Sequence, residues 1–132
     1  MTAPPAAAAR AIDPPAERSV GSRHWAEPRV RRWLEARGWT TLAQNATFRH
    51  GEIDLVMREG DTIVFVEVRQ RTSAGCGGPG ESLVARKQAR VRRAAATWLA
   101  SRALHEASVR FDAALVSGDA DAARVTLVRD AF

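Results

Sequence analysis

The chain has 132 residues, 45% of them hydrophobic and 27% charged, so it can bury the core of one domain of ordinary size. This composition excludes a wholly disordered or collagen-like chain, and no apolar run approaches the roughly 18 residues that a membrane-spanning helix requires. Cys76 is the only cysteine, which excludes an intramolecular disulfide and a multi-cysteine zinc site and favours a reducing cytoplasm.

Basic residues outnumber acidic residues by 20 to 15, which gives a net charge of +5, and 19 of the 20 are arginine. Such an excess favours a polyanionic partner, nucleic acid before an anionic membrane surface. A coding preference for arginine over lysine would produce the same bias, so composition alone leaves both explanations open.

Residues 1–20 are rich in alanine and proline and lack the bulky side chains of a core, so we expect a disordered tail. The domain is expected over 21–132 and begins with a helix at 24–37 that ends at Gly38, since glycine favours helix termini. Val30, Trp33 and Leu34 form the apolar stripe of this helix.

Glu27 lies near the start of the same helix. Pro28 belongs in a first turn, so the regular helix starts near Ala26 or Glu27. Because Glu27 precedes Val30 by three positions and Leu34 by seven, its carboxyl group is expected to point toward the core side.

Alternating or β-branched stretches follow, and they predict strands. They cover residues 41–48, 52–58, 62–69, 109–116 and 124–128. A glycine-rich loop at 72–80 and a long helix at 82–103 separate the third strand from the fourth. This order predicts an α/β protein with a mixed central sheet flanked by helices.

The long helix carries two different faces. Val84, Val91, Ala95 and Trp98 are expected to face the core. Basic residues line another part of its surface, among them Arg86, Lys87, Arg90 and Arg93. Phosphate contacts from such a face would give affinity for nucleic acid without sequence readout, but a solvated helix face has the same pattern.

The sharpest feature is an acidic pair within residues 51–71. Gly-Asp at 60–61 suits a two-residue type II′ turn between two antiparallel strands. In that register Asp54 lies directly opposite Glu67, with Cβ atoms about 4.5–5.5 Å apart. Like charges at that separation destabilise a sheet unless they are neutralised.

A divalent cation would neutralise this pair. Asp54, Glu67 and a backbone carbonyl such as that of Val68 would form a hard oxygen site for Mg²⁺ or Mn²⁺. Arg69 shares the face of Glu67, and Glu52 would lie opposite Arg69. The alternative is a solvent-exposed sheet face with an Arg–Glu ion pair.

Several of these segments together resemble the YraN family of small bacterial endonuclease-like proteins. That family is related by fold to archaeal Holliday-junction resolvases and to the PD-(D/E)XK nuclease superfamily. The resemblance covers roughly residues 21–132, and GEID followed by FVEV is its most specific mark. The matching features are the 21–27 segment with the helix to Gly38-Trp39, Asn45, residues 51–54, residues 64–68, Arg71, Lys87, residues 110–112 and the terminal Ala131-Phe132.

The resemblance implies a restriction-endonuclease-like αβββαβ core and a site for magnesium or manganese. By it, Asp54 matches the metal-binding aspartate, Glu67 the glutamate of the (D/E)XK motif, and Glu27 a helical glutamate that some relatives add. Arg69 stands where the motif has lysine. Arginine can hold a phosphate, but it cannot plausibly accept a proton, so this departure weakens water activation.

Three functions follow from these residues. The first is a metal-dependent endonuclease acting on DNA, including branched DNA, with Asp54, Glu67 and Arg69 as catalytic residues. The second is a nucleic-acid-binding module that Arg69 has weakened catalytically, and the third is a protein-interaction adaptor. Related resolvases act as dimers, so the resemblance also leaves a homodimer open.

Overall fold

The computed structural model describes residues 25–49, 51–71, 81–118 and 122–132. The expected N-terminal tail and glycine-rich loop, and the side chain of Val84, lie outside the described residues. The elements are α2 (Ala26–Glu35), β1 (Thr40–Phe48), β2 (Gly51–Glu59), β3 (Thr62–Arg71), α3 (Glu81–Ser101), β4 (Ser108–Ser117) and β5 (Arg124–Val128). Their order and bounds match the sequence prediction to within a few residues.

The five strands form one sheet in the order β1-β2-β3-β4-β5. Strands β3 and β4 are parallel and the other neighbours are antiparallel, because α3 carries the chain back across the sheet between them. The mixed α/β architecture with flanking helices is therefore confirmed, and it is compatible with a restriction-endonuclease-like core.

Helix α2 ends in a Schellman motif at Gly38, as its glycine predicts. The N–H of Trp39 donates to the carbonyl of Leu34, and that of Gly38 donates to Glu35. Gly38 has a φ of +95°, a left-handed conformation that costs glycine little. Trp39 and Leu34 are both buried, so the motif also fixes where β1 begins.

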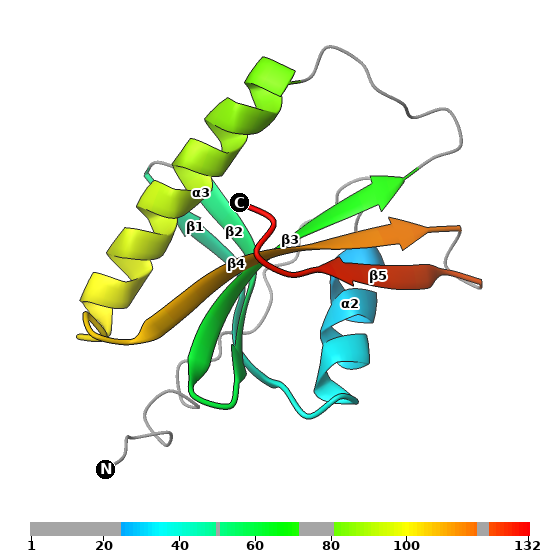
Figure 1. Cartoon of the computed structure of the whole chain (residues 1–132), viewed down its shortest axis with the longest axis horizontal. Helices are drawn as coiled ribbons and strands as arrows, with labels where there is room; N and C mark the ends of the chain where they lie inside the picture. The colour runs from blue at the N-terminus through cyan, green and yellow to red at the C-terminus, as the bar shows by residue number, and fades with distance from the viewer. Residues whose placement is uncertain (1–24, 50, 72–80, 119–121) are drawn as a thin grey trace.

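Strands β2 and β3 run side by side from their shared turn and then diverge, so that the sheet opens like a fork (Figure 1). Gly60 in that turn has a φ of +60°, as the first central residue of a type II′ turn requires. Regular pairing runs from Glu59–Thr62 to Leu55–Val66. It stops one pair short of Asp54 and Glu67, although the predicted register is correct for every pair before that point.

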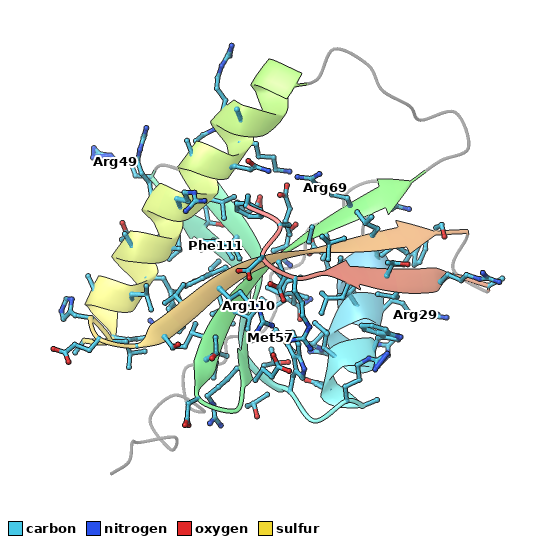
Figure 2. All side chains as sticks on the ribbon, viewed as in Figure 1. Arg29, Arg49, Met57, Arg69, Arg110 and Phe111 are labelled. Atoms are coloured by element: carbon cyan, nitrogen blue, oxygen red, sulfur yellow. The ribbon has the colours of Figure 1, made fainter. Side chains whose placement is uncertain are left out.

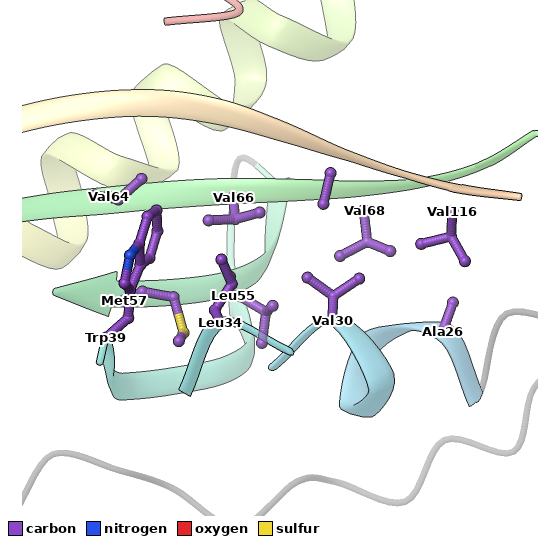
Figure 3. Packing of buried hydrophobic residues seen from close by; sticks show 11 residues of the cluster. Ala26, Val30, Leu34, Trp39, Leu55, Met57, Val64, Val66, Val68 and Val116 are labelled. Carbon is purple, nitrogen blue, oxygen red and sulfur yellow. The ribbon is translucent and has the colours of Figure 1, made fainter. Parts of the chain in front are cut away.

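The two helices pack on opposite faces of the sheet. The core beneath α2 contains Val30 and Leu34 of the helix and Val66, Val68 and Val116 of the sheet (Figure 3). The core beneath α3 contains Val91, Ala94, Ala95 and Trp98 of the helix and Leu42, Ile53, Val56 and Phe65 of the sheet. The two cores lie on opposite faces of the sheet.

The alternation of side chains between the two faces of the sheet is interrupted in β2 at Asp54. Ile53 packs in the α3-side core, whereas Leu55, two residues later, packs in the α2-side core. Residues two apart in a regular strand share a face, so the backbone turns through the intervening residue. The sheet is therefore irregular at the position of the predicted catalytic aspartate.

A buried ion-pair network secures the end of the chain. Arg110 forms a bidentate ion pair with Asp112, at 2.8 and 2.9 Å, and also contacts Glu59. The N–H of Asp130 donates to Asp112, and Arg129 binds Glu59. Since Asp112 is fully buried, its charge is compensated by these hydrogen bonds.

Within the described part of the chain, neither helix is long and apolar enough to cross a membrane.

Candidate active site

Asp54 lies where β2 and β3 separate. Its Oδ2 accepts a hydrogen bond of 2.8 Å from the N–H of Val68, so the side chain replaces the backbone partner that Val68 would have in a regular ladder. The sequence prediction used the carbonyl of Val68 as a metal ligand, whereas the contact that forms uses its N–H. Asp54 is thereby held beside Glu67 without pairing directly opposite it.

Glu27 reaches Asp54 from α2. A hydrogen bond joins the two carboxyl groups, and desolvation together with the nearby Asp54 charge raises the pKa of Glu27 to about 7. Glu52, which is exposed, raises this pKa further, while a hydrogen bond from the Asn45 side chain lowers it. The predicted core-side orientation of Glu27 is correct, and its carboxyl group carries a proton in the acidic to neutral range.

Burial also raises the pKa of Asp54 above its ordinary value. The N–H of Val68 and the Lys87 charge oppose that shift, and the Glu67 charge adds to it. The Glu67 charge therefore acts on Asp54, in keeping with the closeness that the sequence predicted for these two carboxylates.

Glu67 is almost completely buried and lies between two cations. Its Oε1 is 3.2 Å from Nη2 of Arg69, and its Oε2 is 2.9 Å from Nζ of Lys87. The Lys87 contact is an ion pair without hydrogen-bond geometry, so Oε2 keeps an unused lone pair. Figure 2 shows Arg69 between α3 and β3.

Lys87 makes a contact that the sequence did not indicate. The helical pattern grouped it with Arg86, Arg90 and Arg93 as a nucleic-acid contact, and its ammonium group also lies against Glu67. All four basic residues are exposed. Two signals in the sequence singled out Lys87: it is the only lysine in the chain, and it is one of the residues that match the YraN family. Helical spacing could not show which strand its side chain meets.

Glu27, Asp54 and Glu67 supply carboxyl groups at the fork, but the described residues do not form a metal-binding arrangement. Among the described residues, no group of three or more His, Cys, Asp or Glu side chains has metal-binding geometry. Glu27 instead has a pKa raised to about 7 by burial and by the neighbouring Asp54, and Glu67 is bound by cations. A cation could replace the proton on Glu27, because carboxylate oxygens are the ligands that Mg²⁺ and Mn²⁺ prefer.

Comparison with known proteins gives the family. The model of the uncharacterised protein family UPF0102 matches residues 26–116, so the chain belongs to that family, and the predicted YraN resemblance is confirmed. A UPF0102 protein of Beutenbergia cavernae is 48% identical over 99 residues, covering 74% of this chain and 84% of the relative.

Further relatives come from other bacteria. A UPF0102 protein of Halorhodospira halophila is 47% identical over 107 residues, covering 81% of this chain and 83% of the relative. One of Serratia proteamaculans is 44% identical over 104 residues, covering 77% and 87%. The names of these relatives state no activity, so the site itself must carry the functional argument.

Proposed function

We propose that this protein is a metal-dependent endonuclease-like enzyme that acts on DNA phosphodiesters, including those of branched DNA. One observation carries the proposal: the buried Glu67 lies between Lys87 and Arg69, beside the Glu27–Asp54 carboxyl pair. Carboxylates next to cations are what a site needs if it binds a divalent metal and an anionic phosphate together.

The carboxyl groups supply the metal-binding part of the site. Glu27, Asp54 and Glu67 would hold Mg²⁺ or Mn²⁺, with the unused lone pair on Oε2 of Glu67 as one donor. A divalent ion bound there supplies Lewis acidity and lowers the pKa of a coordinated water. Its charge would also oppose the burial and the Asp54 charge that now make Glu27 retain a proton.

Arg69 and Lys87 supply the phosphate-binding part. Arg69 is held by Glu67, so its guanidinium group is oriented before a phosphate binds, and its planar fork suits two phosphate oxygens. Lys87 adds an ammonium group that can donate a proton to a leaving oxygen. Lys87 would therefore assist the leaving group, whereas activation of the water, which Arg69 cannot perform, would fall to the bound metal ion.

The exposed arginines of α3 extend the site toward the DNA backbone. Arg86, Arg90 and Arg93 lie on the helix that carries Lys87, and all three are exposed. Contacts from them to phosphates would position the duplex without reading its sequence. Such contacts suit selection by DNA shape, and a homodimer and a cytoplasmic location remain part of this proposal.

A nucleic-acid-binding module is the second candidate function. Arg69 favours it, because arginine at the motif position holds phosphate but does not activate water. The two functions differ in whether a bound metal ion activates the water that Arg69 cannot activate, with Lys87 assisting the leaving oxygen.

Cleavage assays separate the two candidates. The protein is incubated with branched and linear DNA and Mg²⁺ or Mn²⁺, alongside Asp54→Asn, Lys87→Ala and Arg69→Lys. The enzyme proposal expects cleavage that Asp54→Asn abolishes and that Lys87→Ala lowers by about 100-fold, in the range typical of proton-transfer groups. Salt-dependent binding with no cleavage by any variant would leave the binding module, and absence of DNA binding would overturn both.

A further inference from the structure

The face of β4 and β5 that points away from α2 has no helix over it. Val125 and Leu127 pack in the α2-side core, as do Ala114 and Val116, so the residues that alternate with them point to the opposite face of the sheet. On that opposite face, α3 lies over β1 and β2 (Figure 1). Among the described residues, Phe111 is the one hydrophobic side chain of β4 that packs with the α3-side core, and β5 contributes none.

The contact of Phe132 with Phe111, with ring centroids 5.3 Å apart, covers the first part of this face. Beyond Phe111, four uncharged residues of the two paired strands remain, and we call them the β4–β5 strip: Ala113, Leu115, Thr126 and Val128. Val128 is 39% exposed, and Thr126 is exposed as well. The strip is therefore open to solvent on its β5 side.

The β4–β5 strip continues directly from the candidate active site. Two cross-strand rows connect them, Glu67–Ala113–Val128 and Arg69–Leu115–Thr126. Since neighbouring strands lie about 4.8 Å apart, each row extends roughly 10 Å from β3 to β5. Residues of one row point to the same face of a sheet, so the strip lies on the face on which Glu67 contacts Lys87.

Cations border the β4–β5 strip on both sides. On the β3 side, the side chain of Arg69 is 35% exposed and that of Lys87 is 48% exposed. On the β5 side, Arg124 is exposed and by strand alternation shares the face of Thr126. Glu67, the acidic residue of the two rows, is almost completely buried, so the charge that the rows present to solvent is positive. An uncharged surface between cations suits the sugar-phosphate backbone of a nucleic acid, which arginine and threonine side chains contact.

We propose that the β4–β5 strip is a binding surface for a DNA strand, which runs from the phosphate held at Arg69 across Leu115 and Thr126 toward Arg124. Arg124 would bind a further phosphate of that strand, the Thr126 hydroxyl would donate to its backbone, and Val128 would contact a sugar. The inference rests on the proposed function, because it takes a phosphate at Arg69 as its starting point. It adds the path that the bound strand follows from there.

Two exposed valines give a matched test. Val128→Glu places a negative charge on the strip, and Val109→Glu places the same charge on a residue of β4 that is 37% exposed and is separated from the strip by Phe111. Binding of fluorescently labelled branched and linear DNA to the full chain is measured by anisotropy, in EDTA and in Mg²⁺. We expect Val128→Glu to weaken binding at least about tenfold and Val109→Glu to change it less than about twofold, with unchanged circular dichroism spectra.

A second pair of variants tests the phosphate contact at the β5 border. Arg124→Ala should reduce the slope of log affinity against log salt concentration by about one, because one phosphate contact is lost. Arg32→Ala, the same change at an exposed position of α2 on the other side of the sheet, should leave that slope unchanged.

The outcomes separate this inference from the proposed function. Equal effects within either pair of variants would overturn the inference alone. Self-association that Val128→Glu abolishes, with DNA binding unaffected, would assign the strip to a second copy of the chain and would also overturn it. DNA binding that depends on the strip, without cleavage, would support the inference and count against the enzyme. Absence of DNA binding by the wild type would overturn the proposed function and the inference together.

Discussion

The Lys87 ammonium group lies 2.9 Å from Oε2 of Glu67 and joins α3 to the strand that carries the buried carboxylate. The Glu67 side chain is 3% exposed and the Lys87 side chain is 48% exposed, so solvent reaches the site along the lysine. Lys87, the only lysine of this arginine-rich chain, thus contacts Glu67. Two residues after Glu67, where the family motif has a lysine, this chain has Arg69.

The Lys87 contact predicts a stability effect that is independent of any activity. Lys87→Ala leaves the buried Glu67 with Arg69 as its one remaining ion-pair partner among the described residues, and should lower the free energy of unfolding by about 1–2 kcal/mol. Urea denaturation measures this loss of stability. The control is Arg86→Ala on the same helix, which should change stability by less than about 0.5 kcal/mol. Equal effects of the two substitutions would mean that the ion pair contributes nothing.

The raised pKa of Glu27 predicts how stability depends on pH. Its pKa is about 7 in the folded protein and 4.5 in a model peptide, so the folded state binds the extra proton between those values. This contribution to stability is therefore full below about pH 4.5 and is lost as pH rises through 7. Glu27→Gln mimics the protonated form, so we expect its melting temperature to exceed that of the wild type at pH 8 and to vary less between pH 5 and pH 8. A pH profile unchanged by Glu27→Gln would contradict the assignment.

A divalent cation should stabilise the protein most at pH values at which Glu27 has lost its proton. Because Mg²⁺ or Mn²⁺ would replace the proton on the Glu27–Asp54 pair, the increase in melting temperature on adding metal should be larger at pH 8 than at pH 5.5. Differential scanning calorimetry with and without MnCl₂ tests this. Asp54→Asn should abolish the increase at both pH values, and a metal effect that persists in that variant would arise elsewhere.

The network at Arg110 predicts a large structural effect far from the fork. Arg110→Ala would leave the fully buried Asp112 without its bidentate partner and should destabilise the protein by about 3–5 kcal/mol. Arg129→Ala removes an ion pair that is 54% exposed on the arginine side and should cost less than about 1 kcal/mol. Chemical denaturation compares the two arginines, and similar losses would show that burial does not decide the difference.

The end of α3 offers a stabilising substitution. The N–H of Leu104 donates to Leu99 and that of Ala103 to Ala100, which forms a second Schellman motif with Ala103 at a φ of +57°. Ala103→Gly should raise stability by about 0.5–1 kcal/mol, because alanine is strained in this conformation. Ala100→Gly, an identical change at an exposed helical position, should lower stability by about 1 kcal/mol. If both substitutions destabilise the protein, the left-handed turn is not kept in solution.

The sequence by itself determined the elements, their order and much of the register. Hydrophobic periodicity located both helices, and Gly38 predicted the end of α2. Gly60 predicted the turn that joins β2 to β3. These features depend on interactions between residues near each other along the chain, which is why local patterns were sufficient. The same patterns paired Asp54 with Glu67, the family resemblance added Glu27, and the structure brings the three together.

Only the tertiary structure decided how that group is connected. The register places Asp54 opposite Glu67, but divergence of the strands gives Asp54 the N–H of Val68 instead. Which strand Lys87 meets depends on how α3 crosses the sheet, and Asn45 adopts a left-handed conformation inside a strand. Helical spacing and strand alternation describe faces within one element. They carry no information on the crossing of two elements or on a break in the alternation, and the candidate site lies where both occur.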